Sequence, residues 1–295
     1  MAVKATIEVP PKLRPILSKP LGSVRYRGAY GGRGSGKSFS FAKMAAVMGY
    51  TRTMRILCTR ELQVSIKDSF HTEVKRAIAS EPWLQAAYIV GENYIRGRHN
   101  GTEFLFKGLR HNISSIKSMS NLDLCIVEEA EDVPESSWIE LIPTIRAPKS
   151  EIWVIWNPRT DGSPVDLRFR KNTDADMAFV ELSYRDNPWF PDVLETERQR
   201  DMRNCDPGIY AHIWDGAYLE ISDAQVFNGK WKIEDFETAA DWDGPYFGAD
   251  WGFSSDPTVL VKSWIGGKNL YIEREAGGVG VELDDIPDMF RSIPG

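Results

Sequence analysis

The feature that most constrains this chain is a glycine-rich stretch near its amino terminus, residues 31–38. It reads GGRGSGKS and matches the pattern G-x-x-x-x-G-K-[ST] at every position. A strand-like run, 24–30, precedes it, and a helix-like run, 37–50, follows it. Glycines allow several backbone N–H groups to converge on an anion, and the amino terminus of a helix adds positive potential. The order of strand, loop and helix therefore predicts a phosphate-binding loop rather than a ligand-free turn.

The residues of this loop predict how a nucleotide is held. We expect Lys37 to reach the β- and γ-phosphates and Ser38 to hold Mg²⁺. Arg33 and Lys37 are also catalytic candidates, because positive charge stabilises the charge that develops on a transferred phosphoryl group. The nucleotide-binding candidates are Gly31, Gly32, Arg33, Gly34, Ser35, Gly36, Lys37 and Ser38.

Two adjacent acids, Glu128 and Glu129, follow the apolar run 122–127. After an apolar strand, the first acid is expected to order Mg²⁺ through water beside Ser38. The second acid is expected to polarise the attacking water as a general base. Many nucleotidases carry Asp at the first position, so Glu128 departs from the common pattern but keeps its charge. Acidic loops after strands are common, so the catalytic interpretation of this pair depends on the phosphate loop upstream.

The arginine that completes the site has two possible sources. Arg33 lies in the loop itself and could act within its own subunit, or it could clamp a loop or pair with an acid in the absence of nucleotide. A neighbouring subunit could supply the arginine instead. The candidates for that role are Arg60, Arg110 and Arg146.

Asn157 ends the apolar run 152–156 and has two possible roles. Its amide could sense the γ-phosphate or the attacking water, or it could cap the turn before Pro158. Tyr26 and Arg27 could flank an adenine ring, although ordinary strand residues are the simpler interpretation.

The rest of the chain alternates strands with helices, which predicts a mainly parallel sheet with helices on both faces. Asn100-Gly101 predicts a hairpin turn. The four prolines of residues 1–23 predict an extended arm rather than a helix. The further expected strands are 54–59, 122–127, 152–156 and 179–183, the hairpin is 94–108, and the helices are 62–79, 134–145 and 191–203.

Composition narrows the class of protein. The chain has 295 residues and a net charge of −6, which neither favours nor excludes contact with nucleic acid through a local patch. Its three cysteines lie far apart without C-x-x-C spacing, which disfavours zinc and a disulfide scaffold and suits a reducing compartment. No apolar run approaches 18 residues and no signal peptide is visible, so we expect a cytoplasmic protein without a membrane partner.

Taken together, these motifs resemble the large terminase subunits of tailed bacteriophages, which package DNA. The similarity covers residues 25–220 closely and 246–275 more loosely. It rests on motifs that occur in the order this family shows: GGRGSGKS, CTRELQVSIKDS, IKSMSNLDLCIVEEAEDVPESSWIELIPTIR, EIWVIWNP, SYRDNPWFP and YAHIWDG.

The resemblance implies an α/β P-loop NTPase of the additional-strand, conserved-glutamate type over residues 24–214, with a linker over 215–245. It implies ATP and Mg²⁺ as ligands, and hydrolysis that drives double-stranded DNA into a prohead. Asn157 would lie in the segment that couples hydrolysis to movement. The implied partners are the portal protein, the small terminase subunit and other copies in a ring, in the cytoplasm of the host cell.

The family also carries a ribonuclease H-like nuclease, and residues 246–295 resemble its beginning. Its first metal-binding acid matches Asp250 in YFGADWG. Such nucleases need three or four acids around two Mg²⁺ or Mn²⁺ ions. No later acid lies on a strand placed to complete the cluster, so we expect an incomplete site and no DNA cleavage by this chain alone.

Three other classes of function share the phosphate loop. A different DNA translocase or a helicase-like ATPase is the nearest, but no strand-separating motif is visible. A nucleotide or small-molecule kinase is disfavoured because Glu129 directly follows Glu128, which favours attack by water. A structural subunit that holds nucleotide only for stability is the third.

Overall fold

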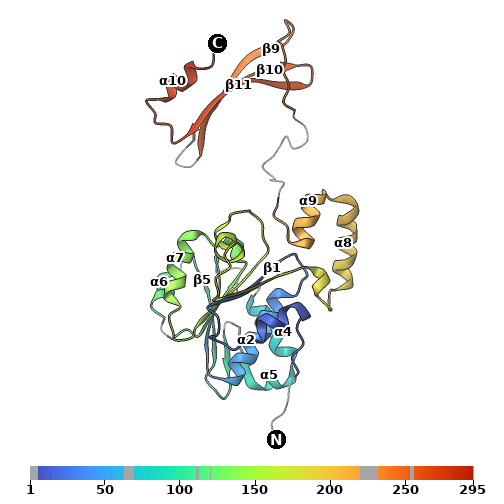
Figure 1. The fold of residues 1–295 in the computed structure, drawn as a ribbon, viewed down its shortest axis with the longest axis vertical. Coiled ribbons are helices and arrows are strands. Elements are labelled where there is room, and N and C mark those ends of the chain that lie inside the picture. Colours follow the sequence, from blue (N-terminus) through green and yellow to red (C-terminus); the bar gives the residue numbers. More distant parts are fainter. Residues whose placement is uncertain are drawn as a thin grey trace. The chain divides into compact units, whose positions relative to one another are not determined.

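The structure is a computed structural model that describes residues 6–62, 70–92, 94–110, 113–119, 121–219, 232–252 and 256–294. The chain forms two compact units, Met1–Val226 and Phe227–Gly295. The first contains a large sheet covered by helices, and the second contains a small sheet of its own (Figure 1).

The sheet of the first unit has eight strands in the part of the chain that the structure describes, in the order β3-β4-β5-β2-β6-β7-β1-β8. From β5 to β8 in this order, neighbouring strands pair in parallel. The pairs β3–β4 and β4–β5 are antiparallel. The predicted mainly parallel sheet is confirmed, and β7 lies as an additional strand between β1 and β6. The strands are β1 Tyr26–Gly31, β2 Arg55–Arg60, β3 Tyr88–Val90, β4 Ile95–Gly97, β5 Glu103–Gly108, β6 Leu124–Glu128, β7 Glu151–Trp156 and β8 Met177–Leu182.

Helices cover both faces of this sheet, because alternate residues of its central strands are apolar on both sides. In β7, Trp153 packs edge-on against Phe41 of one helical layer, while Val154 and Trp156 belong to the core on the opposite face. The first layer is α2 Lys37–Thr51, α4 Phe70–Ala79 and α5 Pro82–Ala87, and the second includes α6 Ile113–Lys117, α7 Glu135–Thr144 and η3 Asp166–Arg170.

The amino-terminal arm is helical over part of its length, so the prediction of an extended arm is wrong there. A 3₁₀ turn, η1 Pro11–Leu13, leads into α1 Arg14–Leu17. Proline is tolerated in the first turn of a helix, where its missing N–H has no intrahelical partner. The buried Arg27 then donates hydrogen bonds to carbonyls at the end of the arm and pairs with Glu151 at 2.8 Å. Tertiary contacts with the sheet therefore dock the arm.

The other expected elements are present with shifted ends. The hairpin β4–β5 turns at Asn100-Gly101, and β3 extends it as a strand that was not predicted. The expected helix 62–79 is described only from Phe70, because residues 63–69 lie outside the described part. After β8 come η4 Tyr184–Asp186, α8 Asp192–Asn204, α9 Pro207–Tyr210 and η5 Ala211–Asp215.

The expected linker, 215–245, begins on the surface of the first unit. The backbone N–H of Leu219 donates to Arg159 O at 2.8 Å, and Ala217 N–H donates to Ala211 O at 3.2 Å. Residues 220–231 of this segment lie outside the described part of the chain.

The second unit is a three-stranded antiparallel sheet, in the order β11-β10-β9 within its described residues. Its strands are β9 Asp243–Asp250, β10 Pro257–Gly266 and β11 Asn269–Val279, followed by α10 Ile286–Arg291. The predicted succession of strand, loop, strand, tight turn and strand is confirmed, whereas α10 was not predicted. Leu260 of β10 and Ile286 of α10 are both buried.

Across both units, none of the described helices is long and apolar enough to cross a membrane.

Candidate nucleotide site

The parallel sheet brings the candidate residues together at one edge. The carboxyl ends of parallel strands lie on the same side of a sheet, and ligands bind in the crevice outside them. Here β6 ends at Glu128, β7 is followed by Asn157, and β1 leads into the phosphate loop. All three line one cleft of about 690 Å³.

The phosphate loop, residues 31–36, joins β1 to α2 in a shape that only glycine fits. Gly31, Gly34 and Gly36 have φ of 129°, 72° and 77°. A Cβ on Gly31 would lie 1.9 Å from Leu182 O, and one on Gly32 would lie 2.0 Å from Trp214 O. The backbone of β8 and of η5 therefore packs directly behind the loop and fixes its position.

Lys37 opens α2 and folds back over the loop. Its Nζ donates to Gly31 O at 2.9 Å, to Gly32 O at 2.8 Å and to Ser35 Oγ at 2.9 Å. The side chain is only 6% exposed, and this burial lowers the pKa of Lys37 to about 7, although Glu128 opposes the shift. A phosphate oxygen would compete with these three acceptors for the ammonium group.

Ser38 and Glu128 meet at the predicted magnesium position. Ser38 Oγ donates to Glu128 Oε1 at 3.1 Å. Burial raises the pKa of the Glu128 carboxyl, while the Arg60 guanidinium opposes that shift. A hydroxyl and a carboxylate side by side are the oxygen ligands that Mg²⁺ prefers, with water and phosphate as the others, so the pair fits this ion.

Glu129 has an unusual backbone conformation directly after β6. Its φ of 50° and ψ of 46° lie in the left-handed region, which residues other than glycine rarely adopt. Its side chain is 58% exposed and lines the cleft. A carboxylate held this way can reach a water molecule in front of the loop.

Arg60 holds both acids, a role that the sequence did not reveal. Its Nε donates to Glu128 Oε2 at 2.5 Å, and its Nη2 pairs with Glu129. The residue ends β2, which is the sheet neighbour of β6. Arg60 is only 5% exposed, and this burial in its own subunit is incompatible with the alternative that Arg60 reaches a neighbour's site.

Arg33 lies at the tip of the loop. Its backbone N–H donates to Ile213 O at 2.8 Å, and its exposed side chain lines the cleft. Among the described residues, its guanidinium has neither a hydrogen bond nor an ion pair. Of the other finger candidates, Arg110 and Arg146 are exposed and lie outside the cleft lining.

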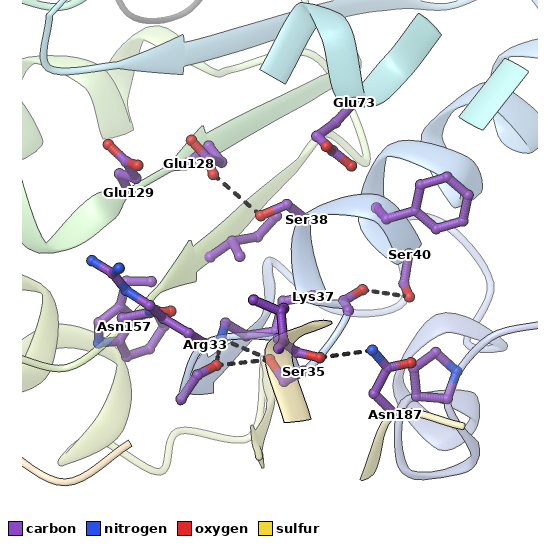
Figure 2. Close-up of a pocket in the computed structure, with 18 of the residues that line it drawn as sticks. Arg33, Ser35, Lys37, Ser38, Ser40, Glu73, Glu128, Glu129, Asn157 and Asn187 are labelled. Atoms are coloured by element: carbon purple, nitrogen blue, oxygen red, sulfur yellow. Dashed lines mark hydrogen bonds between the residues drawn. The ribbon is translucent and has the colours of Figure 1, made fainter. Parts of the chain in front are cut away.

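Asn187 is a second residue that sequence reasoning missed, although it lies in the motif SYRDNPWFP. Its Nδ2 donates to Gly34 O at 2.7 Å, and its Oδ1 accepts from Trp189 N–H at 3.0 Å. Figure 2 shows it on the side of the loop near Ser40, whereas Glu128 and Glu129 lie on the other side. Asn187 therefore ties the segment after β8 to the phosphate loop.

Glu131 connects the acidic turn to the segment after Asn157. It lies in η2, Ala130–Asp132, and accepts hydrogen bonds from Thr160 N–H at 2.8 Å and Ser163 Oγ at 3.3 Å. Partial burial raises the pKa of Glu131. These bonds join the two loops that carry Glu129 and Asn157.

Tyr26 and Arg27 are absent from the lining of the cleft. Tyr26 packs against Phe169 with ring centroids 5.2 Å apart, and Arg27 is buried under the arm. The simpler interpretation, that they are ordinary strand residues, agrees with these positions.

Asp250 ends β9 in the second unit, where it pairs in register with Val259 and is exposed. Within the described residues, no three His, Cys, Asp or Glu side chains gather in a way that could hold a metal ion. The metal-binding role of Asp250 remains a prediction.

Residues 24–217 match the protein family described as phage terminase large subunit. The PBSX phage terminase large subunit of Bacillus subtilis (strain 168) is 27% identical over 130 residues, which is 44% of this chain and 30% of that protein. The matched stretch thus spans less than a third of that relative.

Solved structures share the fold at low identity. The large terminase from a thermophilic bacteriophage has a TM-score of 0.63 at 14% identity, over 97% of this chain and 74% of that one. The same large terminase in complex with ATP-gamma-S gives 0.59 at 13% identity, over 96% and 72%. The family match covers the phosphate loop, both acids and Asn157, and this chain belongs to the phage terminase large subunit family.

Proposed function

We propose that this chain hydrolyses ATP at the cleft around Lys37 and uses the reaction to move double-stranded viral DNA into a prohead. The observation that carries the proposal is that Lys37 and Ser38 at the start of α2 and Glu128 and Glu129 at the end of β6 line one cleft. A Gly-rich turn without catalytic purpose would not require a buried lysine and two acids clamped by Arg60.

The loop and Lys37 bind the triphosphate. Backbone N–H groups of the loop and the ammonium of Lys37 hold the β- and γ-phosphate oxygens. Ser38 and Glu128 would hold Mg²⁺, which would supply positive charge to those oxygens. In this arrangement the γ-phosphorus faces Glu129.

Glu129 activates the water. The water oxygen bonds to the γ-phosphorus, its proton passes to the Glu129 carboxylate, and the bond from the γ-phosphorus to the β,γ-bridging oxygen breaks. ADP and inorganic phosphate are the products. Arg33 stabilises the transferred charge from within the same subunit, because its guanidinium lines the cleft and has no partner among the described residues.

Asn157 transmits the state of the cleft to the segment that leaves the first unit. Two contacts support this role. The residue after Pro158, Arg159, accepts a hydrogen bond from Leu219 N–H. Gly216 lies so close to the loop that a Cβ on it would be 2.5 Å from Gly31 Cα. A displacement of the phosphate loop would therefore also displace residues 216–219.

The remaining parts of the proposal follow from the family. The partners are double-stranded DNA, the portal protein, the small terminase subunit and further copies in a ring, in the host cytoplasm. DNA is gripped through phosphates without sequence preference, so binding is expected to weaken with salt. Asp250 contributes to a nuclease metal site, for which the described residues supply no cluster of further ligands.

The test compares Glu129→Gln with Glu135→Gln. Glu135 is the matched control, because it is a half-exposed glutamate that pairs with Arg168 at the surface. Loss of the general base lowers ATP hydrolysis roughly 100- to 10,000-fold, while ATP binding stays within about threefold. The control hydrolyses ATP like the unchanged protein. Equal hydrolysis by Glu129→Gln would remove the assigned base, and failure of the unchanged protein to bind ATP would overturn the proposal.

A concentration series tests the source of the arginine. If Arg33 acts in its own subunit, ATP turnover per chain is flat against protein concentration, and Arg33→Ala lowers it at every concentration. A steep rise of turnover with concentration would assign the finger to a neighbour instead.

A further inference from the structure

The cleft has a second end, on the other side of the loop from Glu128 and Glu129, where apolar side chains lie beside the ion pair of Arg76 with Glu73. Figure 2 shows Ser40 and Asn187 on the side of the loop opposite Glu128 and Glu129. The apolar lining residues from the segments around Ser40 and Asn187 and from the arm are Phe39, Trp189, Pro191, Leu194 and Pro10. The arm meets the segment after β8 there, since Lys12 Nζ pairs with Asp186.

Trp189 is the large aromatic residue at this end, and its position is fixed from the phosphate loop. The Asn187 amide that accepts from Trp189 N–H at 3.0 Å also donates to Gly34 O at 2.7 Å. On its other side, Phe190 packs so closely under Gly34 that a Cβ there would lie 2.3 Å from the ring. Both neighbours of the Pro188–Trp189 pair are thus anchored to the loop.

The Trp189 side chain nevertheless remains 52% exposed and lines the cleft. A tryptophan on an anchored turn offers a rigid aromatic face with little conformational entropy to lose on binding. The chain therefore holds a flat apolar surface at a set position relative to the phosphate-binding N–H groups.

The direction of the nucleotide follows from the chemistry of the two ends. The γ-phosphate must lie toward Glu128 and Glu129, the residues that would hold Mg²⁺ and activate the attacking water. The nucleoside must then extend from the loop toward the opposite end, where the lining includes Phe39 and Trp189. Nucleobases stack on aromatic side chains with a sizeable gain in affinity, whatever their hydrogen-bonding edge.

We propose that Trp189 is the platform on which the base of the nucleoside triphosphate stacks. The inference rests on the proposed nucleotide binding at the phosphate loop. Trp189 supplies affinity for the nucleoside part of the ligand, and Asn187 is a positioning residue that sets the distance from the platform to the phosphates. Because every base has a π face, the stack sets affinity rather than the choice among bases.

The experiment measures dissociation constants by calorimetry for ATP and for inorganic tripolyphosphate, which carries the phosphates without a base. Three variants of the full chain are compared: Trp189→Ala, Trp189→Phe and the matched control Trp251→Ala. Trp251 is likewise an exposed tryptophan, 62% exposed, in the second unit. Trp189→Ala is expected to weaken ATP roughly 5- to 150-fold and tripolyphosphate less than twofold. Trp189→Phe keeps a ring and recovers most of the ATP affinity, and Trp251→Ala changes neither ligand.

The outcomes separate the platform from the proposed function. If Trp189→Ala binds ATP like the unchanged protein, or loses ATP and tripolyphosphate equally, the base platform is overturned and the phosphate site stands. If the unchanged protein binds neither ligand, the phosphate site itself fails and the platform fails with it.

Discussion

Sequence motifs identify both the phosphate loop and Asp250, but the two have very different surroundings in the structure. Lys37 lies at the meeting point of β1, α2 and β6, and it makes three hydrogen bonds to the loop. Asp250 lies exposed at the end of β9. The described part of the second unit brings no cluster of ligands to it.

This difference shows that a motif residue becomes a site only through neighbours from other elements. At the phosphate loop the neighbours are Arg60 from β2, Glu128 from β6 and Asn187 after β8. These contacts are buried or partly buried, and the two charged residues, Arg60 and Glu128, pair with each other, which is typical of functional sites. At Asp250, a single exposed carboxylate on an edge strand, the described residues provide no such contact.

Lys37→Ala gives the largest expected effect. The variant removes the buried ammonium that contacts the loop, so ATP hydrolysis should fall roughly 100- to 1,000-fold. The measurement is steady-state ATP turnover, with Lys117→Ala as a control because Lys117 pairs with Glu140 in a half-exposed ion pair. Turnover within tenfold of the unchanged protein would show that the loop is not the reaction site.

Arg60→Ala tests whether a residue outside the sequence motifs contributes to ATP hydrolysis. Without the guanidinium, the buried Glu128 carboxyl loses the group that opposes the rise of its pKa, so it takes up a proton at a higher pH. Activity is expected to fall roughly 10- to 100-fold at neutral pH, which is typical when a residue that orients a metal ligand is removed.

The acidic limb of the pH profile distinguishes this role from loss of structure. It should move to higher pH in Arg60→Ala and return toward its original position in Arg60→Lys, which keeps the charge. A uniform loss of activity with an unmoved limb would mean that Arg60 only supports the fold.

The same comparison explains how much of the site the sequence could predict. The loop, Glu128 and Glu129 were predictable because each lies in a contiguous pattern of apolar run followed by polar residues. Arg60 and Asn187 were not, because their roles depend on which strands are neighbours. The order β2-β6 and β1-β8 is set by tertiary packing, and periodicity along the chain carries no record of it.

The fold was predictable to a similar degree and for a similar reason. Buried strands such as β7 show as continuous apolar runs, so the parallel sheet was expected and is present. The arm was mispredicted because its helix ends against Arg27 of β1, which Glu151, distant in sequence, holds in place. Proline composition indicated its local preference but not this docking.

The pH dependence of ATP binding probes burial at the loop. The pKa of Lys37 is lowered to about 7, and phosphate prefers the charged ammonium. Above pH 7 the ligand must restore a proton to Lys37, so the dissociation constant should rise by up to roughly tenfold per pH unit and level off below pH 7. Calorimetry in buffers of different ionisation enthalpy should detect proton uptake at pH 8. In Lys37→Arg, whose guanidinium stays charged, the slope should vanish, and an equal slope in that variant would assign the proton to another group.

Asp250→Ala is expected to give the smallest effect, because this exposed carboxylate forms no ion pair with any described residue. A two-metal site needs several convergent ligands, and one carboxylate binds Mn²⁺ too weakly to orient a phosphodiester between two ions. Plasmid DNA incubated with this chain and Mn²⁺ should therefore stay uncut, with or without the substitution, and ATP hydrolysis should be unchanged. Cleavage by the unchanged chain that Asp250→Ala abolishes would place the missing ligands in segments outside the described residues. The contrast between the phosphate loop and Asp250 would then mean only that the ligands of Asp250 lie outside the described residues. It would no longer mean that Asp250 lacks a metal site.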